Sequence, residues 1–363
     1  MIEELGDQRM FIHYARTHGL HGLEREIAPY YSRIPKWLGV YPSHAPNILA
    51  VTPIYDNSED PPGGNRRVKP SCGIMPLAES YDVARFLIEA WENMHPKATR
   101  FCEVRLPVDD VFGSDNMSRA LTDAGYRIEA TMPNLFTIDG REYTVNDFAR
   151  NKPERLSEFP ERNRIIPRVM QEVFWNEQVR RLTIPEIEGL CKNLENTYEI
   201  RRARPEDAEG IVRLMQRTFR NYGTFNIATA MPEMIQDNSP IASIVYVARR
   251  KDNGEVVATG TLERSAFGFG EFTDTAVDQD NSGNIGLATA LAYRASLEAR
   301  QKGITHYWSD NIPSAAISKV AKRLGAVFCG IHENHVRIMT HQLYELIRRD
   351  PDSLDLIVCS GAL

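Results

Sequence analysis

The chain has 363 residues, of which 42% are hydrophobic and 25% are charged, the composition of a globular protein long enough for about two domains. Its 43 basic and 49 acidic residues leave a net charge of −6, which argues against a general binder of nucleic acid or of acidic membranes. Apolar runs stay well short of the ~18 residues of a membrane helix, and the first ten residues lack the apolar segment of a secretory signal.

Residues 1–150 predict an N-terminal α/β domain. Within the first 70 residues, 10–16 fit either a strand or a short helix, and 57–69 contain the Pro and Gly residues of a surface loop. Beyond them, the apolar spacing predicts a helix over 80–94, a strand over 100–106, a helix over 116–124 that ends at Gly125, and a strand pair over 126–132 and 135–138.

Residues 151–196 predict a helical connector, because charged residues alternate there with apolar residues at helical spacing.

Clearer patterns of helices and strands follow over 197–345. Strands are predicted over 198–203, 244–248, 256–262, 271–277, 304–309 and from 327, and helices from 205, over 285–302 and over 313–324. This order, with Asn253-Gly254 as a hairpin turn, predicts a mixed, mostly antiparallel sheet flanked by helices, an α/β (α+β) fold. Residues 346–363 are assigned to a C-terminal tail.

A candidate anion site lies where the strand 271–277 ends, a polar loop turns, and a helix starts near Ile285 with small residues. The first N–H groups of a helix have no partner within the helix and favour anions. Glycine and alanine would let a pyrophosphate approach the backbone closely. An ordinary glycine-containing loop before a core helix is the alternative.

When the order of elements is added, residues 197–340 resemble the GNAT (GCN5-related N-acetyltransferase) superfamily. The matching motifs are 200–208 on its first strand and helix, Asp252-Asn253-Gly254 on its hairpin, 283–288 on its acyl-CoA signature, and Leu324-Gly325 after its last helix. The resemblance implies acetyl-CoA as the cofactor. The cofactor-binding residues that it implies are Ala276, Val277, Gly283, Asn284, Ile285, Gly286, Leu287, Ala288 and Ser314.

Three positions depart from the pattern of the superfamily. Gly283 replaces the Gln or Arg that opens the acyl-CoA signature, Ser314 replaces an asparagine, and Ala321 replaces the tyrosine often used as general acid. Within the superfamily the chain most resembles the β-lysine N6-acetyltransferases. That resemblance rests on residues 219–227, 272–276 and 125–133.

The N-terminal domain resembles a degenerate copy of the same fold. Residues 120–128 are similar to 320–328, and in each the pattern is a helix ended by glycine and followed by a strand. Chance use of the same helix–Gly–strand pattern is the alternative. Because no acyl-CoA signature precedes the first copy, we expect a non-catalytic half without a second CoA site.

Acetyl transfer to an amine needs a base, and the two candidates are Glu271 and Asp274. Strict strand alternation would place Glu271, Thr273, Thr275 and Val277 on one face, and Phe272, Asp274 and Ala276 on the other. Either acid could instead be an ordinary solvated or ion-paired strand residue. Tyr222 and Phe225 are candidates to line the acceptor pocket, or they simply close the core.

The sequence gives only weak evidence for disulfides or a metal site. The five cysteines are far apart and contain no CxxC, so we expect a reducing, cytoplasmic location. His332, His335 and His341 lack a Cys or paired carboxylate at ligand spacing, so no metal is expected.

The sequence therefore predicts an acetyl-CoA-dependent N-acetyltransferase that acts on a small amine, such as an amino acid or diamine resembling β-lysine. The alternative is a catalytically inactive acyl-CoA-binding protein or adaptor. No nucleic-acid or membrane partner is expected, and a homodimer is left open.

Overall fold

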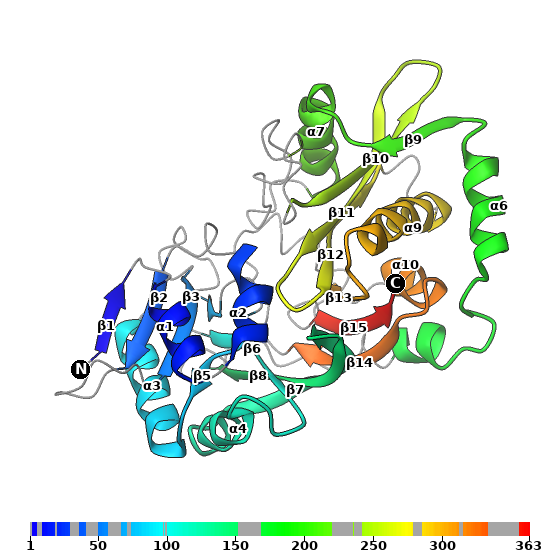
Figure 1. Cartoon of the computed structure of the whole chain (residues 1–363). Helices are drawn as coiled ribbons and strands as arrows, with labels where there is room; N and C mark the ends of the chain where they lie inside the picture. The colour runs from blue at the N-terminus through cyan, green and yellow to red at the C-terminus, as the bar shows by residue number, and fades with distance from the viewer. Residues whose placement is uncertain are drawn as a thin grey trace. The chain divides into compact units, whose positions relative to one another are not determined.

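The computed structural model describes residues 2–5, 9–18, 20–29, 36–40, 50–56, 67–70, 74–96, 98, 100–151, 168–219, 235, 242–278, 285–311, 315–332 and 356–363 (Figure 1). The chain forms two compact units. The first unit consists of Met1–Pro160, Ser265–Gly268 and Gly330–Arg337, and the second of Glu161–Arg264, Phe269–Cys329 and Ile338–Leu363. Residues 161–196 of the predicted connector therefore group with the second unit, and residues 151–160 group with the first.

Every element predicted for 197–345 is present in the predicted order, and all but the end of β14 lie in the second unit. These elements are β9 (Tyr198–Arg202), η5 (Pro205–Asp207), α7 (Ala208–Phe219), β10 (Ile244–Arg250), β11 (Val256–Arg264), β12 (Phe269–Val277), α9 (Ile285–Gln301), β13 (His306–Asn311), α10 (Ala315–Arg323) and β14 (Val327–His332). The connector contains a π-helical turn, η4 (Met170–Phe174), and the helix α6 (Ile184–Leu194). The turn between β10 and β11 places Gly254 at φ 72°, a conformation that glycine adopts without strain.

The strands of the second unit lie in the order β14-β15-β13-β12-β11-β10-β9. Neighbours from β9 to β12 are antiparallel, β12 and β13 are parallel, and β13 and β15 are antiparallel. The predicted α/β fold with a mixed, mostly antiparallel sheet is confirmed.

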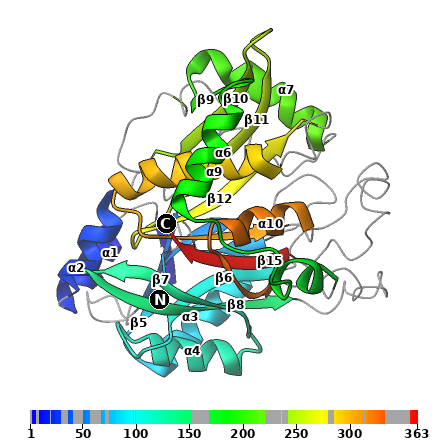
Figure 2. The same ribbon diagram turned by 90° about the vertical axis from the view of Figure 1, so that its right-hand side faces the viewer.

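The strand β15 (Leu356–Ala362) comes from residues that the sequence assigned to a tail. It pairs with β13 from His306↔Ala362 to Asn311↔Ile357 and is the red strand of Figure 2. The local sequence pattern does not predict this strand, because its side chains become buried only when the chain returns to pair with β13.

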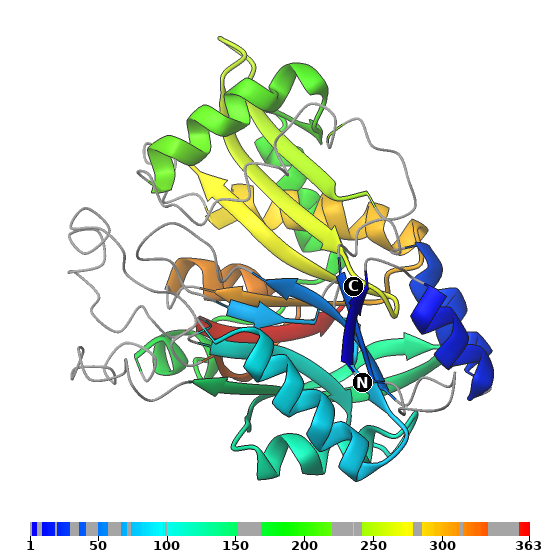
Figure 3. The same ribbon diagram turned by 90° about the vertical axis from the view of Figure 1, so that its left-hand side faces the viewer.

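Helices cover both faces of the strands β9–β12. One face packs against α7 through a core that includes Ile211, Leu214, Val245, Val247 and Ala276. The other face packs against α9 through Ile244, Leu262, Ala295 and Ala299. Figure 3 shows the two helices on opposite sides of these strands. Side chains alternate between the two faces along each strand, so each strand feeds both cores.

The first unit also has a mixed sheet with helices. Its elements are β1 (Ile2–Leu5), α1 (Arg9–Thr17), α2 (His21–Ile27), β2 (Lys36–Val40), β3 (Ala50–Asp56), β4 (Arg67–Lys69), β5 (Leu77–Ala78), α3 (Tyr81–Met94), β6 (Arg100–Pro107), α4 (Ser114–Asp123), β7 (Arg127–Ile138) and β8 (Arg141–Asn151). The segment 10–16 is therefore helical, and the predicted loop 57–69 ends in a strand.

The predicted strand pair 126–132 and 135–138 is wrong. These residues form the single strand β7, and its partner is β8, which begins after a turn at Asp139-Gly140. Both turn residues have positive φ, 50° and 73°, as a two-residue hairpin turn requires. The pairing jumps from Met132↔Val145 to Phe136↔Tyr143, so Pro133-Asn134 make an irregularity inside a strand and not a turn between strands.

The two units repeat one topology. The order β1-β2-β3-β4-β6-β8-β7 in the first corresponds to β9-β10-β11-β12-β13-β15-β14 in the second. In each, one parallel pair joins the fourth and fifth strands of that order, β4·β6 and β12·β13, beside antiparallel pairs. The helices α4 and α10 occupy equivalent places and are followed by Gly125 and Gly325 at φ 85° and 91°. The similar segments 120–128 and 320–328 lie at these places.

Candidate functional site

The strands β12 and β13 form a fork in the second unit. Their parallel pairing covers Phe269↔His306, Gly270↔Tyr307 and Glu271↔Trp308. Beyond these pairs β12 continues to Val277, while β13 continues to Asn311 paired with β15. Among the described residues, the edge of β12 over 272–277 is therefore not paired with β13, and it offers backbone N–H and C=O groups to a ligand.

A β-bulge interrupts β12 inside this fork. The pairing with β11 passes from Thr261↔Thr273 to Thr259↔Ala276, so β12 contains one more residue than its partner over this interval. The side-chain alternation therefore changes phase after Thr273. Glu271, Thr273 and Ala276 share one face, and Phe272 and Val277 share the other. The prediction that Glu271 and Val277 lie on one face is wrong, because strict alternation does not survive a bulge.

The end of β12 lies against the start of α9. Ala276 is buried in the core on the α7 side, and Val277 packs on the α9 side against a core cluster that includes Leu287 and Leu291. This packing places the strand end beside the first turn of α9, which contains Ile285, Gly286, Leu287 and Ala288.

The first turn of α9 is suited to an anion. It contains no acidic side chain, and Ile285 and Gly286 are only half-buried. Leu287 and Ala288 are buried and anchor the turn, and the Thr289 hydroxyl donates to the Ile285 carbonyl at 2.8 Å. The first N–H groups of a helix lack acceptors within the helix and carry the positive end of its dipole. These residues fit a pyrophosphate held by backbone N–H groups.

Two carboxylates stand opposite each other at the closed end of the fork. Glu271 pairs with Glu263 of β11, and Thr273 pairs with Thr261. All four side chains point to the α7 face. The linear pattern does not reveal cross-strand register, so the sequence did not place Glu263 opposite Glu271.

Tyr307 is a second residue that the sequence did not single out. It lies on β13 beside the fork and packs edge-on against Phe272, with ring centroids 4.9 Å apart. Its hydroxyl is buried without a hydrogen-bond partner among the described residues, and burial raises the pKa of Tyr307 above its ordinary range. At neutral pH this phenol is protonated.

Several predicted site residues cannot be placed. Gly283, Asn284, Ser314, Tyr222 and Phe225 lie outside the described residues, and Asp274 is described only in its backbone, at the bulge. Their roles stay predictions.

Ala321 stands where the resemblance expects a tyrosine, and it is buried on α10. Its neighbour Lys322 donates to the carbonyls of Val173, Phe174 and Asn176 at 2.8–3.0 Å. An ammonium has three donors, so these contacts commit Lys322 to holding α10 against the connector.

A pocket of about 380 Å³ lies elsewhere in the second unit, between α7 and the β10–β11 turn. Its arginines are paired with carboxylates: Arg213 with Glu209, and Arg217 with Glu255 and Asp278. It does not include the fork.

None of the described helices is long and apolar enough to cross a membrane, and no group of three metal-ligating side chains occurs among the described residues.

Comparisons with known proteins identify structures but no sequence relatives. No family model and no curated protein matches the chain. A GNAT-family acetyltransferase from Streptococcus pneumoniae is 17% identical and matches 46% of this chain and 99% of its own, with a TM-score of 0.37. The ribosomal-protein-alanine N-acetyltransferase from Brucella melitensis is 18% identical over 46% and 99%, with a TM-score of 0.36. A protein from Mycobacterium tuberculosis, solved in complex with CoA, is 21% identical over 46% and 99%, with a TM-score of 0.32. Sequence identities and TM-scores this low do not support an inference about the reaction.

Proposed function

We propose that the chain is an acetyl-CoA-dependent N-acetyltransferase that acts on the amine of a small molecule. The observation that carries the proposal is the fork. Over 272–277, β12 contains a bulge and has one edge that is not paired with β13 among the described residues, and the next described helix, α9, starts without acidic residues. The open edge suits the amides of an extended pantetheine arm, and the start of α9 suits its pyrophosphate.

Acetyl-CoA supplies an acyl group activated as a thioester. The contribution of the chain is to hold that group and to prepare the amine. Backbone N–H groups at the bulge are candidates to polarise the thioester carbonyl. Glu271, on the α7 face, is the first candidate to accept the proton of the amine, directly or through water, and Glu263 helps to hold the ammonium.

The acceptor is proposed to be an amino acid or diamine resembling β-lysine. The opposed carboxylates on β11 and β12 favour a cationic substrate. Tyr222 and Phe225 remain the proposed lining of the acceptor pocket.

A non-catalytic acyl-CoA-binding protein is the second candidate. The observation that favours it is Ala321, whose buried methyl group cannot donate a proton to the leaving thiol.

Calorimetric titration with acetyl-CoA, followed by a screen of amines for release of free thiol, tests both candidates. Acetyl-CoA binding with thiol release in the presence of an amine supports the enzyme. Binding without release for any amine supports the second candidate, and absence of binding contradicts both.

Gly286→Val provides the sharpest variant, because a β-branched side chain in the first turn of α9 would occupy the space of the pyrophosphate. We expect acetyl-CoA affinity to fall at least about tenfold, or ~1.4 kcal/mol. The matched control is Gly189→Val on α6, where a Cβ meets nothing within 4 Å. Unchanged affinity in a folded Gly286→Val protein would rule out this site.

A further inference from the structure

The first unit contains a fork equivalent to the one in the second unit, and it is bridged by charged side chains. Its parallel pair covers only Arg67↔Arg100 and Val68↔Phe101. The next residue of β4 is Lys69, and its Nζ lies 2.8 Å from both carboxylate oxygens of Glu103 on β6. An ion pair thus joins the two strands at the point where, in the second unit, they separate.

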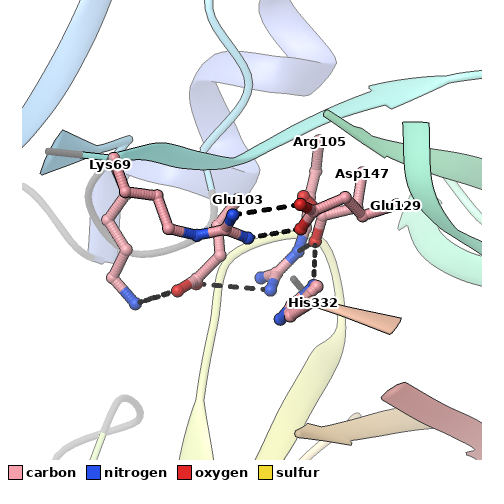
Figure 4. A network of polar contacts seen from close by, with 7 residues as sticks. Lys69, Glu103, Arg105, Glu129, Asp147 and His332 are labelled. Atoms are coloured by element: carbon pink, nitrogen blue, oxygen red, sulfur yellow. Dashed lines mark hydrogen bonds and ion pairs between the residues drawn. The ribbon is translucent and has the colours of Figure 1, made fainter. Parts of the chain in front are cut away.

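The bridge is one end of a buried network (Figure 4). Glu103 also accepts from Arg105 at 3.3 Å, Arg105 donates to Asp147 of β8 at 3.1 Å, and the Nε2 of His332 lies 3.3 Å from Asp147. Beside these residues Arg100 forms a two-bond pair with Glu129. Except for Lys69, which is 27% exposed, every one of these side chains is at most 5% exposed.

Each carboxylate of this network contacts a basic side chain. Glu103 contacts Lys69 and Arg105, Glu129 contacts Arg100, and Asp147 contacts Arg105 and His332. Burial raises the pKa of Asp147, but the charge of Arg105 and the contact with His332 outweigh it, so that pKa lies below its ordinary value. Removing one partner would leave an uncompensated buried charge, which is costly.

The backbone beyond the fork also differs between the units. In the second unit β12 continues over 272–277 with an open edge, whereas in the first unit β4 ends at Lys69 and is followed by the buried Pro70, which has no N–H to offer. The equivalent helix start, that of α3, is capped by the Ser80 hydroxyl, which accepts from the Val83 N–H at 3.4 Å, and it contains Asp82. A capping acceptor and an acidic side chain both disfavour an anion there.

We infer that the first unit is a copy of the fold whose fork is closed by an ionic plug, Lys69–Glu103–Arg105–Asp147, so that it admits no acyl-CoA and serves as a non-catalytic unit. The inference rests on the proposed function for the identity of the excluded ligand. The plug itself stands on the contacts above. Three independent features of the first unit act in the same direction: a salt bridge across the fork, a proline in place of an open edge, and a capped acidic helix start.

Hydrogen–deuterium exchange of the full chain, with and without saturating CoA, tests where the ligand binds. We expect CoA to slow exchange only in peptides from β12 and the start of α9. Slower exchange in peptides from β4, β6 or the start of α3 would overturn the inference.

A second arm tests the plug without any ligand. Glu103→Gln keeps the size of the side chain and removes the charge that bridges the fork. Exchange in β4 and β6 should become at least about tenfold faster. The control is Glu89→Gln on α3, which removes a carboxylate from the exposed pair with Arg85 in the same unit and should change nothing. Equal exchange in the two variants would overturn the inference.

The two arms distinguish a failure of the proposed function from a failure of the plug. If CoA protects no peptide while Glu103→Gln loosens β4 and β6, the proposed function fails and the plug is supported. If the Glu103→Gln protein is largely unfolded, the separate, conservative variant Lys69→Arg decides, because it keeps a positive charge opposite Glu103. Its exchange should be near native if the ion pair is what joins the strands. Exchange as fast as in Glu103→Gln would contradict the plug.

Discussion

At the scale of single residues, the bulge in β12 decides which acid can act. Because the extra residue lies between Thr273 and Ala276, Glu271 stays on the α7 face with Glu263. Asp274 sits at the bulge itself. The two candidate bases therefore differ in backbone environment as well as in position along the strand, and substitution can separate them.

Glu271→Gln should lower kcat by about 10²–10⁴ while acetyl-CoA affinity is retained, because the loss of a general base slows proton removal without touching the cofactor. Asp274→Asn is the competing variant. Steady-state kinetics with the best amine across pH 6–9 measures the effect, and Glu209→Gln, an exposed carboxylate on α7, is the control. Near-normal turnover in both Glu271→Gln and Asp274→Asn would mean that neither acid is the base.

Gly330 is the residue whose replacement we expect to be least tolerated in the first unit. A Cβ added there would lie 2.0 Å from the Glu129 carbonyl oxygen and 2.6 Å from the Ala130 Cα, both backbone atoms that cannot turn aside. Gly330→Ala should therefore destabilise the fold by at least about 1–3 kcal/mol. Thermal unfolding measures it against Gly189→Ala, and equal melting temperatures for the two variants would contradict the expected clash.

At the scale of elements, the starts of α9, α3 and α7 differ in the acidic and capping groups that they hold. The start of α9 lacks acidic residues, and the start of α3 is capped by a serine hydroxyl. The start of η5 and α7 is fixed by Asp207, which accepts from the Arg204 N–H at 2.8 Å and pairs with Arg201. The starts of α3 and of η5–α7 therefore both hold a carboxylate, and the first turn of α9 holds none.

Asp207→Ala should cost about 3–5 kcal/mol, since it leaves the Arg201 guanidinium without its buried partner and removes the helix cap. Chemical denaturation with a two-state fit measures the loss. Glu206→Ala, one residue away and mostly exposed, should change stability by less than ~1 kcal/mol. If the two variants unfold at the same denaturant concentration, Asp207 does not hold the start of α7.

At the scale of the whole molecule, one topology is used twice with different chemistry at the fork. In the first unit the equivalent region holds buried ion pairs, and in the second it holds an open strand edge. This contrast predicts a pH dependence that belongs to the first unit.

The pKa of Asp147 is lowered in the folded chain, so its ionised form contributes stability above its unfolded pKa of about 3.9, and that stability is lost as the pH falls through the folded value. We therefore expect wild type to exceed Asp147→Asn in melting temperature at pH 7 and the difference to shrink below about pH 4. Thermal unfolding across pH 3–8 measures this. A difference that is constant with pH would show that the loss in Asp147→Asn is one of packing and not of charge.

The sequence by itself determined the order of elements in the second unit. Each helix and strand there carries its own apolar period and its own stop signal, such as Asn253-Gly254 and Gly325, and these are local properties of the chain. The helix–Gly–strand similarity around Gly125 and Gly325 likewise marked equivalent places in the two repeats. The turn at Asp139-Gly140 is a local signal of the same kind.

The tertiary structure alone decided the rest. The bulge in β12 depends on how many residues its partner strand offers, and β15 finds its place only by pairing with β13. The plug joins Lys69, Glu103, Arg105 and Asp147 from three strands. Periodicity reports which face of an element is buried, because burial follows from residues close in sequence. It does not report register or the pairing of buried charges, because those follow from which distant strands meet.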